Sequence, residues 1–128
     1  MKIQFPKGQV VEYKDIDDSL FGKIFMECYS NCMCVDFKWI EPIYSLYLDI
    51  KYIVKHNIPG DIVECGVWKG GMMQFAALLL KNLGDQSRNI YLYDTYLGMP
   101  EPGVYDINWD NYPAKLTYDH YNKQGIKW

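Results

Sequence analysis

The residues best suited to chemistry lie in one glycine-rich segment and at one acid farther along the chain. Residues 64–71 have the sequence ECGVWKGG. Gly66 permits a tight turn, and Gly70 and Gly71 would let a ligand approach the first N–H groups of a following helix. Asp94 stands about 20 residues farther on, where an acid at a strand tip takes the two hydroxyls of a ribose. The pattern predicts an adenosine-cofactor site, and the alternative is a strand end with a purely structural turn.

The charge of Glu64 separates the two main cofactor classes. NAD sites favour the spacing G-x-G-x-x-G, which lets the backbone approach a pyrophosphate, whereas this chain has G-x-x-x-G-G with bulky Trp68 in the turn. A carboxylate before the glycines repels a pyrophosphate but suits a cationic amino-acid ligand. S-adenosylmethionine carries an ammonium, a sulfonium and a ribose, and no phosphate. The sequence therefore favours S-adenosylmethionine over NAD, with an NAD oxidoreductase as the weaker option.

Hydrophobic periodicity predicts the elements that position this segment. Residues 61–67 and 89–94 are short and rich in β-branched or aromatic side chains, which predicts strands, and residues 72–83 have the pattern of a buried helix that Gly84 ends. Strand, glycine turn, helix and strand form a βαβ unit, so the sheet is expected to be parallel with a right-handed crossover. Apolar residues at helical spacing predict two earlier helices, the first following Asp17-Asp18-Ser19 and the second beginning near Pro42.

The two ends of the chain give weaker patterns. Residues 3–5 and 9–13 flank Pro6-Lys7-Gly8, which suggests a small hairpin or an irregular terminus. Residues 95–113 are rich in Gly and Pro and predict a long loop of the kind that is functional or mobile. Residues 114–123 suggest a short helix.

Composition limits the classes of partner. With 128 residues, 49% hydrophobic and 23% charged, the chain has room for one small globular domain. Its net charge is −3 and Arg88 is its only arginine, which argues against a nucleic-acid partner. No apolar run approaches the roughly 20 residues of a membrane span, and the start MKIQFP lacks the apolar core of a signal peptide, so we expect a cytoplasmic protein.

The cysteines favour thiols over a metal site. Cys28, Cys32 and Cys34 form a C-x3-C-x-C cluster, and Cys65 stands in the glycine-rich segment. A structural zinc needs four ligands at workable spacing, and Cys34 would point away from the helix face that Cys28 and Cys32 share. In a reducing compartment we expect buried or half-buried free thiols and no metal ligands.

Two blocks of sequence resemble a known family. Residues 58–71, IPGDIVECGVWKGG, and residues 94–102, DTYLGMPEP, resemble the macrocin O-methyltransferase (TylF/MycF-type) family of S-adenosylmethionine-dependent enzymes. The second block is similar to the family's D-[ST]-F-x-G-[MF]-P loop, with Tyr96 in place of Phe. The resemblance covers roughly residues 41–102, about half of the chain, and implies a Rossmann-like class I methyltransferase fold of the α/β class.

The resemblance also implies roles for individual residues. Glu64, Gly66 and Gly70-Gly71 correspond to the glycine-loop part of the cofactor site, Asp94 to the ribose-binding acid and Thr95 to the small polar residue beside it. Trp68 and Met99 suit hydrophobic packing as well as ligand contact. The resemblance itself implies methyl transfer to a hydroxyl of a small molecule, a sugar or polyketide-type compound.

The catalytic base and metal are less well defined. A hydroxyl nucleophile needs a general base or a metal that lowers its pKa. His120 is the only histidine after Asp94 and is the candidate base, although an exposed histidine on a polar helix is the alternative. Family members hold Mg²⁺ with carboxylates later in the chain, and the resemblance implies that those ligands are not among these residues.

The length predicts an incomplete enzyme. Residues 1–40 are expected to form a strand and helix extension, and residues 41–128 the N-terminal half of an S-adenosylmethionine-binding domain, truncated after the N-terminal helices and the first βαβ unit. The expected function is an S-adenosylmethionine-dependent O-methyltransferase or a fragment of one, inactive by itself. The alternative is a non-catalytic, truncated methyltransferase-like module that pairs with a complementing chain, or with itself as a homo-oligomer, across the open edge of its sheet.

Overall fold

A computed structural model describes residues 2–4, 10–12, 18–32, 40–108 and 110–123 of the chain. The chain forms two compact units, Met1–Asp94 and Thr95–Trp128. The first unit holds the helices and the parallel strands that the sequence predicted around the glycine-rich segment. The predicted boundary between an N-terminal extension, residues 1–40, and half of a cofactor-binding domain, residues 41–128, stays a prediction.

Two helices precede the glycine-rich segment, as the periodicity predicted. Helix α1 spans Ser19–Cys28 and continues into a single 3-10 turn, η1, over Tyr29–Asn31. Helix α2 spans Glu41–Lys55, with Pro42 in its first turn, where a missing N–H costs nothing. The helices α1 and α2 therefore begin where acidic or proline residues suit a helix start.

The glycine-rich segment joins a strand to a helix, and the unit is α/β. Strand β3 spans Ile62–Cys65, helix α3 spans Gly71–Leu83 and strand β4 spans Ile90–Tyr93. The two strands pair in parallel, with Ile62 opposite Ile90 and Cys65 opposite Tyr93. Both strands are shorter than predicted. Gly84 ends α3 in the left-handed conformation, at a φ of 77°, as predicted.

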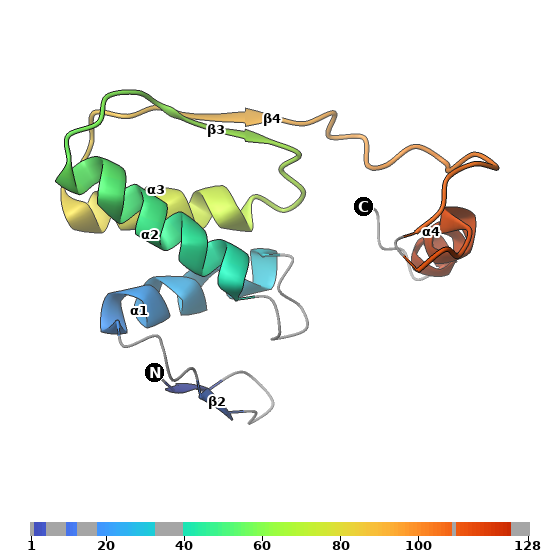
Figure 1. Ribbon diagram of the computed structural model, residues 1–128, viewed down its shortest axis with the longest axis horizontal. Helices are drawn as coiled ribbons and strands as arrows, with labels where there is room; N and C mark the ends of the chain where they lie inside the picture. Colours follow the sequence, from blue (N-terminus) through green and yellow to red (C-terminus); the bar gives the residue numbers. More distant parts are fainter. Residues whose placement is uncertain (1, 5–9, 13–17, 33–39, 109, 124–128) are drawn as a thin grey trace. The chain divides into compact units, whose positions relative to one another are not determined.

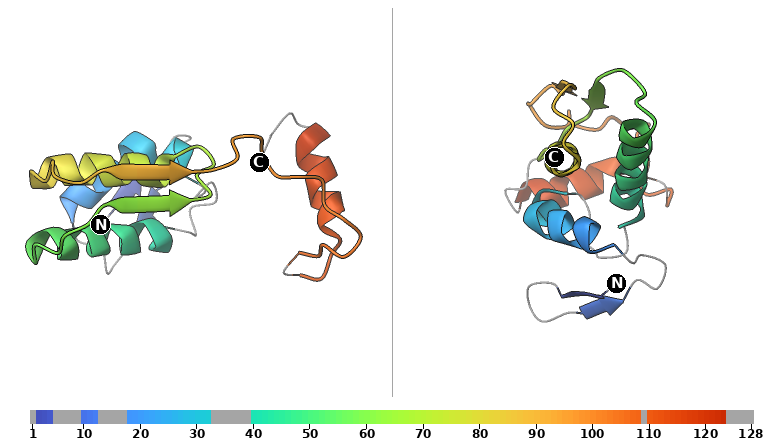
Figure 2. Two further views of the ribbon diagram at one scale, coloured as in Figure 1. Left: turned by 90° about the horizontal axis from the view of Figure 1, so that it is seen from above. Right: turned by 90° about the vertical axis from the view of Figure 1, so that its left-hand side faces the viewer.

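The parallel strands are covered by helices on one side. Figures 1 and 2 show α2 and α3 together beneath the β3–β4 pair, with α1 on the side of these helices away from the strands. Aromatic and aliphatic side chains from all three helices form one buried core, with Phe21, Tyr47 and Phe75 packed ring against ring. The opposite face of the strands presents Val63, Tyr91 and Tyr93 to solvent.

The ends of the chain form smaller elements. Strands β1 (Lys2–Gln4) and β2 (Val10–Glu12) pair antiparallel, which confirms the suggested hairpin. In the second unit, helix α4 spans Ala114–Lys123 and follows an irregular stretch with one bridge between Ile107 and Pro113. Among the described residues, no helix is long and apolar enough to cross a membrane.

The cysteines of the first unit differ in exposure. Cys28 and Cys32 are buried at the end of α1 and after η1, and Cys65 is exposed at the end of β3. The Cys32 thiol donates to the carbonyl oxygen of Cys28 at 3.4 Å. Cys34 lies outside the described residues.

Asp18 joins the start of α1 to the middle of α2. Its Oδ1 accepts the backbone N–H groups of Leu20 at 3.0 Å and Phe21 at 3.4 Å, which caps α1. Its Oδ2 accepts the hydroxyl of Tyr47 and, at 3.0 Å, the ammonium of Lys51. One carboxylate thus satisfies the helix end and the polar tip of a buried tyrosine.

Replacing Asp18 with alanine is expected to destabilise the first unit by about 2 kcal/mol, because a cap and a side-chain hydrogen bond are each worth about 1 kcal/mol. Urea unfolding followed by circular dichroism measures the loss. Asp49→Ala, at an exposed position on α2, is the matched control. Equal stability of the two variants would contradict the role of Asp18.

Candidate functional site

The loop between β3 and α3 has an unusual backbone. Gly66, Trp68 and Gly70 all have positive φ, at 88°, 49° and 73°. Glycine adopts this conformation readily, whereas Trp68 is a non-glycine residue held in a sparsely populated region. The amide of Gly66 donates to Tyr93 at 2.8 Å and that of Gly70 donates to Val67 at 2.8 Å, so the loop is fixed at both ends. The sequence predicted a turn here, and the structure shows a tightly wound one.

Asp94 holds this loop from the end of the neighbouring strand. Its Oδ2 accepts the backbone N–H groups of Val67 at 2.7 Å and Trp68 at 3.4 Å. Successive N–H groups in such a turn form a concavity that attracts an anion, and here a carboxylate of the chain itself lies in it. The sequence predicted Asp94 as a ribose ligand and missed this loop contact. A loop whose N–H groups meet a carboxylate is poorly suited to a phosphate.

Glu64 brings a second carboxylate to the same end of the sheet. It lies on the half-buried side of β3, and its Oε2 is buried with no hydrogen-bond partner among the described residues. Burial, and then the negative charge of Asp94, raise the pKa of Glu64 above its ordinary value of 4.5. A buried carboxylate oxygen without a donor is costly. The arrangement would therefore favour a cationic or hydrogen-bond-donating ligand group at this position.

The glycines of the loop have different surroundings. A Cβ built on Gly66 meets nothing within 4 Å among the described residues, and one on Gly70 meets only Val67 Cγ1 at 3.7 Å. A Cβ on Gly71 would lie 2.3–2.5 Å from the backbone of Asn31 and Cys32. We predicted that Gly71 is small so that a ligand can approach, and this role stays a prediction. The structure adds a packing requirement, because η1 lies against the start of α3.

Two predicted site residues belong to the second unit. Thr95 is exposed, and its Oγ1 accepts the N–H of Leu97 at 3.4 Å in the turn after β4. His120 lies in the last turn of α4, exposed, with its ring 5.5 Å from that of Tyr121. Met99 is also exposed, at 61%. The roles of Thr95 and His120 stay predictions.

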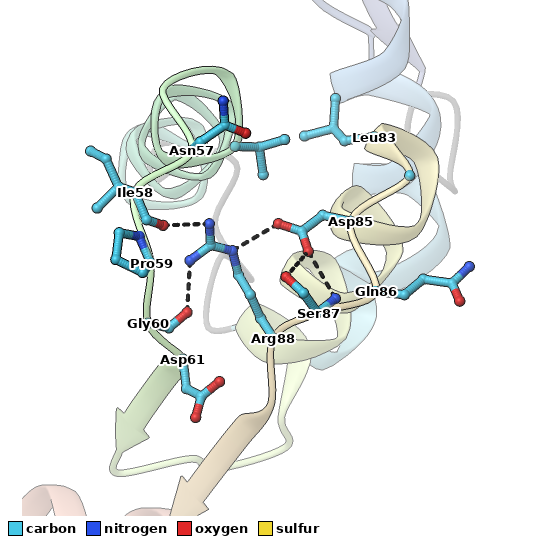
Figure 3. A pocket seen from close by; sticks show the side chains of 12 residues that line it. Asn57, Ile58, Pro59, Gly60, Asp61, Leu83, Asp85, Gln86, Ser87 and Arg88 are labelled. Carbon is cyan, nitrogen blue, oxygen red and sulfur yellow. Dashed lines mark hydrogen bonds and ion pairs between the residues drawn. The ribbon is translucent and has the colours of Figure 1, made fainter.

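A cavity lies at the amino ends of β3 and β4, opposite the end where Glu64 and Asp94 lie. Figure 3 shows Arg88 there, between the segments that lead into β3 and β4. Its guanidinium donates to the carbonyl oxygens of Ile58 at 2.6 Å and Gly60 at 2.7 Å, and to Asp85 at 2.8 Å. Hydrogen bonds from Ser87 and from Arg88 lower the pKa of Asp85 to about 2.

This cavity of about 670 Å³ is lined by the ends of α2 and α3 and the loops after them. Ligands of open α/β sheets bind at the carboxyl ends of the strands, where Glu64 and Asp94 lie, whereas Arg88 lies at the amino ends. Because carbonyls and a carboxylate already engage the guanidinium, we assign Arg88 a structural role.

Comparison with known proteins identifies the family. Residues 43–123 match the macrocin-O-methyltransferase (TylF) family. The chain belongs to this family. No solved structure matches the chain.

Relatives of this macrocin-O-methyltransferase family member are O-methyltransferases by name. An 8-demethyl-8-(2,3-dimethoxy-alpha-L-rhamnosyl)-tetracenomycin-C 4'-O-methyltransferase of Streptomyces olivaceus is 39% identical over 60 residues, which is 47% of this chain and 23% of that protein. Mycinamicin III 3''-O-methyltransferase of Micromonospora griseorubida is 30% identical over 76 residues, 58% of this chain and 28% of that protein. Demethyldecarbamoylnovobiocin O-methyltransferase of Streptomyces niveus is 32% identical over 54 residues, 42% of this chain and 21% of that protein.

The family match covers the predicted site but not all of the first unit. The glycine-rich loop, Asp94, Thr95 and His120 lie within residues 43–123, whereas α1 and η1 precede them. The aligned segments span about a quarter of each of these relatives. Family membership thus confirms the resemblance seen in the sequence, over residues 43–123.

Replacing Arg88 with alanine is expected to destabilise the first unit by about 2–3 kcal/mol, because two carbonyl oxygens and Asp85 lose a charged donor. Thermal and urea unfolding measure the change. Lys81→Ala, at an exposed position of α3, removes a positive charge of the same unit without these contacts and should change stability little. An Arg88→Ala protein as stable as Lys81→Ala would refute the structural role.

Proposed function

We propose that this chain is the cofactor-binding N-terminal part of an S-adenosylmethionine-dependent O-methyltransferase with a Rossmann-like fold. The observation that carries the proposal is that Oε2 of Glu64, at the carboxyl end of β3, is buried and has no hydrogen-bond partner in the part of the chain that the structure describes. It lies in a segment that belongs to a methyltransferase family. A cationic ligand group would satisfy this oxygen and lower the cost of keeping the carboxylate charged.

The charges around the loop favour this cofactor over a dinucleotide. Asp94 and Glu64 bring negative charge to the end of the sheet, and the Val67 and Trp68 amides already donate to Asp94. A pyrophosphate would meet two carboxylates there and would compete with Asp94 for the amides. S-adenosylmethionine has no phosphate, and its ammonium and sulfonium are attracted to the same carboxylates. The loop thus suits a ligand that brings positive charge.

Each residue of the proposed site has a distinct task. Glu64 accepts a hydrogen bond from the ammonium, and the open space at Gly66 admits the ligand close to the backbone. Asp94 accepts a ribose hydroxyl while it holds the loop, with Thr95 beside it in sequence. Gly70 gives the loop the backbone conformation that starts α3. When bound, the cofactor supplies an electrophilic methyl group, and the task of this chain is to orient it.

The acceptor in this proposal is a hydroxyl group of a small molecule, a sugar or a polyketide-type compound. The support is that the relatives are named as O-methyltransferases of a rhamnosyl tetracenomycin, of mycinamicin III and of demethyldecarbamoylnovobiocin. His120 is the proposed base that takes the hydroxyl proton. Mg²⁺ belongs to the complete enzyme in this proposal, with ligands outside these residues.

An alternative is a non-catalytic module that pairs with another chain. The exposed side chains of Val63, Tyr91 and Tyr93 on the uncovered face of β3 and β4 favour it, because parallel strands are normally buried on both faces. In either case we propose that the chain is inactive by itself, and the support is that the aligned segments span about a quarter of these relatives. Cofactor binding separates the two: a folded chain that assembles but does not bind S-adenosylmethionine would support the module.

Calorimetric titration with S-adenosylmethionine tests the proposal. We expect saturable binding with a Kd of about 100 μM or tighter, near −5.5 kcal/mol. Glu64→Gln should weaken binding about ten-fold or more, because the neutral amide keeps an acceptor oxygen but loses the charge that attracts the ammonium.

The matched control for this titration is Glu27→Gln, which removes one exposed carboxylate from α1 and should bind like the unmodified chain. NAD in place of S-adenosylmethionine should give no heat of binding. Tighter binding of NAD, or equal affinity in Glu64→Gln and the unmodified chain, would reject the proposal.

The raised pKa of Glu64 predicts opposite pH dependences for binding and folding. Affinity for S-adenosylmethionine should rise with pH as Glu64 ionises, with a midpoint above the ordinary value of 4.5. Without ligand, the folded state binds this proton more tightly than the unfolded state, so stability should fall over the same interval as pH rises. Titrations and urea unfolding between about pH 5 and about pH 8 measure both, and Glu64→Gln should flatten both curves. Parallel curves would contradict this account.

A further inference from the structure

The start of α3 is held by a segment that lies outside the family match. The 3-10 turn η1 covers Tyr29–Asn31, whereas the match begins at residue 43. Within the first unit, η1 packs directly against α3. The helix that follows the glycine-rich loop is therefore contacted by a segment that the family match does not include.

The contact between η1 and α3 is close and involves backbone atoms. A Cβ on Gly71 would lie 2.3 Å from the carbonyl carbon of Asn31, 2.4 Å from its oxygen and 2.5 Å from the amide nitrogen of Cys32. Backbone atoms cannot move aside as the end of a flexible side chain can. The first residue of α3 is therefore seated on η1, and only glycine fits there.

Side chains on both elements fix the register of this contact. The amide nitrogen Nδ2 of Asn31 donates to Oε1 of Gln74 at 3.1 Å, across 43 residues of sequence. Cys32 is 1% exposed and is anchored to the end of α1 through its bond to the Cys28 carbonyl. Asn31 is half-buried and Gln74 is exposed, so their hydrogen bond lies at the surface of the unit and is not part of its hydrophobic core.

The same segment lies near the carboxylate of the proposed site. The pKa of the Cys32 thiol is raised by its hydrogen bond with Cys28, by burial and by the nearby charges of Cys28 and Glu64. Glu64 lies on the same side of β3 as Ile62, which packs against the core that contains Cys32. The segment that contacts the start of α3 therefore lies on the same side of the strands as the Glu64 carboxylate.

We propose that Asn31 is a cofactor-positioning residue: through Gln74 it holds the first turn of α3, and with it the loop of residues 66–70, in the geometry that binds the ligand. This inference rests on the proposed function for the identity of the ligand. Asn31 does not touch the ligand in this proposal. It fixes the position of the first turn of α3, and therefore the position of the loop that leads into this turn.

Variants at both ends of the bond test the proposal in the full chain. Asn31→Ala and Gln74→Ala should each raise the Kd for S-adenosylmethionine about five-fold, and the double variant should be no weaker than either alone, because both remove the same bond. The exchanged pair Asn31→Gln with Gln74→Asn keeps the combined length of the two amides and should restore most of the affinity. A purely structural contribution would not give this pattern at equal folded fraction.

A matched control and a ligand-free readout complete the experiment. Asn82 also lies on α3 and donates to Leu78 at 2.7 Å, far from the loop, so Asn82→Ala should leave the Kd unchanged. Hydrogen exchange of the Gln74 amide, which donates to Gly70 at 2.9 Å, should be several-fold faster in Asn31→Ala and unaltered in Asn82→Ala.

The outcomes separate this inference from the proposed function. If the unmodified chain binds S-adenosylmethionine and Asn31→Ala binds equally well, the positioning role is refuted and the function stands. If the unmodified chain does not bind, the proposed function fails for this chain, and the exchange measurement alone decides whether Asn31 fixes the start of α3. Equal exchange rates in Asn31→Ala and Asn82→Ala would then overturn the inference.

Discussion

The bond from Val67 N–H to Asp94 Oδ2, 2.7 Å long, joins the two parts of the chain on which the candidate site depends. Asp94 follows β4, whereas Val67 lies in the loop between β3 and α3. The left-handed conformations in this loop bring successive N–H groups together. Without the Asp94 carboxylate, the N–H groups of Val67 and Trp68 would lose this acceptor. The position of the loop relative to β4, and our proposal that it binds a phosphate-free ligand, both depend on that one contact.

Periodicity and turn residues predicted much of the first unit, because those signals are local. The spacing of apolar residues located three helices, and Gly84 marked the end of α3. The packing requirement at Gly71 could not be found in this way, since its neighbour is the backbone of Asn31, 40 positions earlier, and no local pattern encodes that contact. Arg88 entered the sequence analysis only as a charge, and its bonds to Ile58 and Gly60 depend on the parallel pairing of β3 and β4.

The exposed face of the β3–β4 pair bears on our proposal that this chain is part of a larger enzyme. Its parallel strands have helices on one face and solvent at Val63, Tyr91 and Tyr93 on the other. A parallel sheet normally buries both faces, and these relatives are several times longer than their aligned segments. The exposed face of β3 and β4 and the partial coverage of these relatives both support our proposal that this chain is the cofactor-binding part of a larger enzyme.

The cost of the site and its selectivity have the same origin. Glu64 and Asp94 place two carboxylates at one end of the strands, and one oxygen of Glu64 is buried with no donor among the described residues. Burial, and then the charge of Asp94, raise the pKa of Glu64. Asp94 is compensated by the amides of Val67 and Trp68, so the uncompensated charge is that of Glu64. A protein gains nothing in stability from such a group. It gains a position where a cation replaces the favourable interactions with water that the Glu64 carboxylate lost on folding. An anion of similar size would instead be repelled by the two carboxylates. The free energy that burial of Glu64 costs in folding is recovered when a cationic group binds there. For this reason we propose that the ammonium of the ligand lies at Glu64, with its ribose at Asp94.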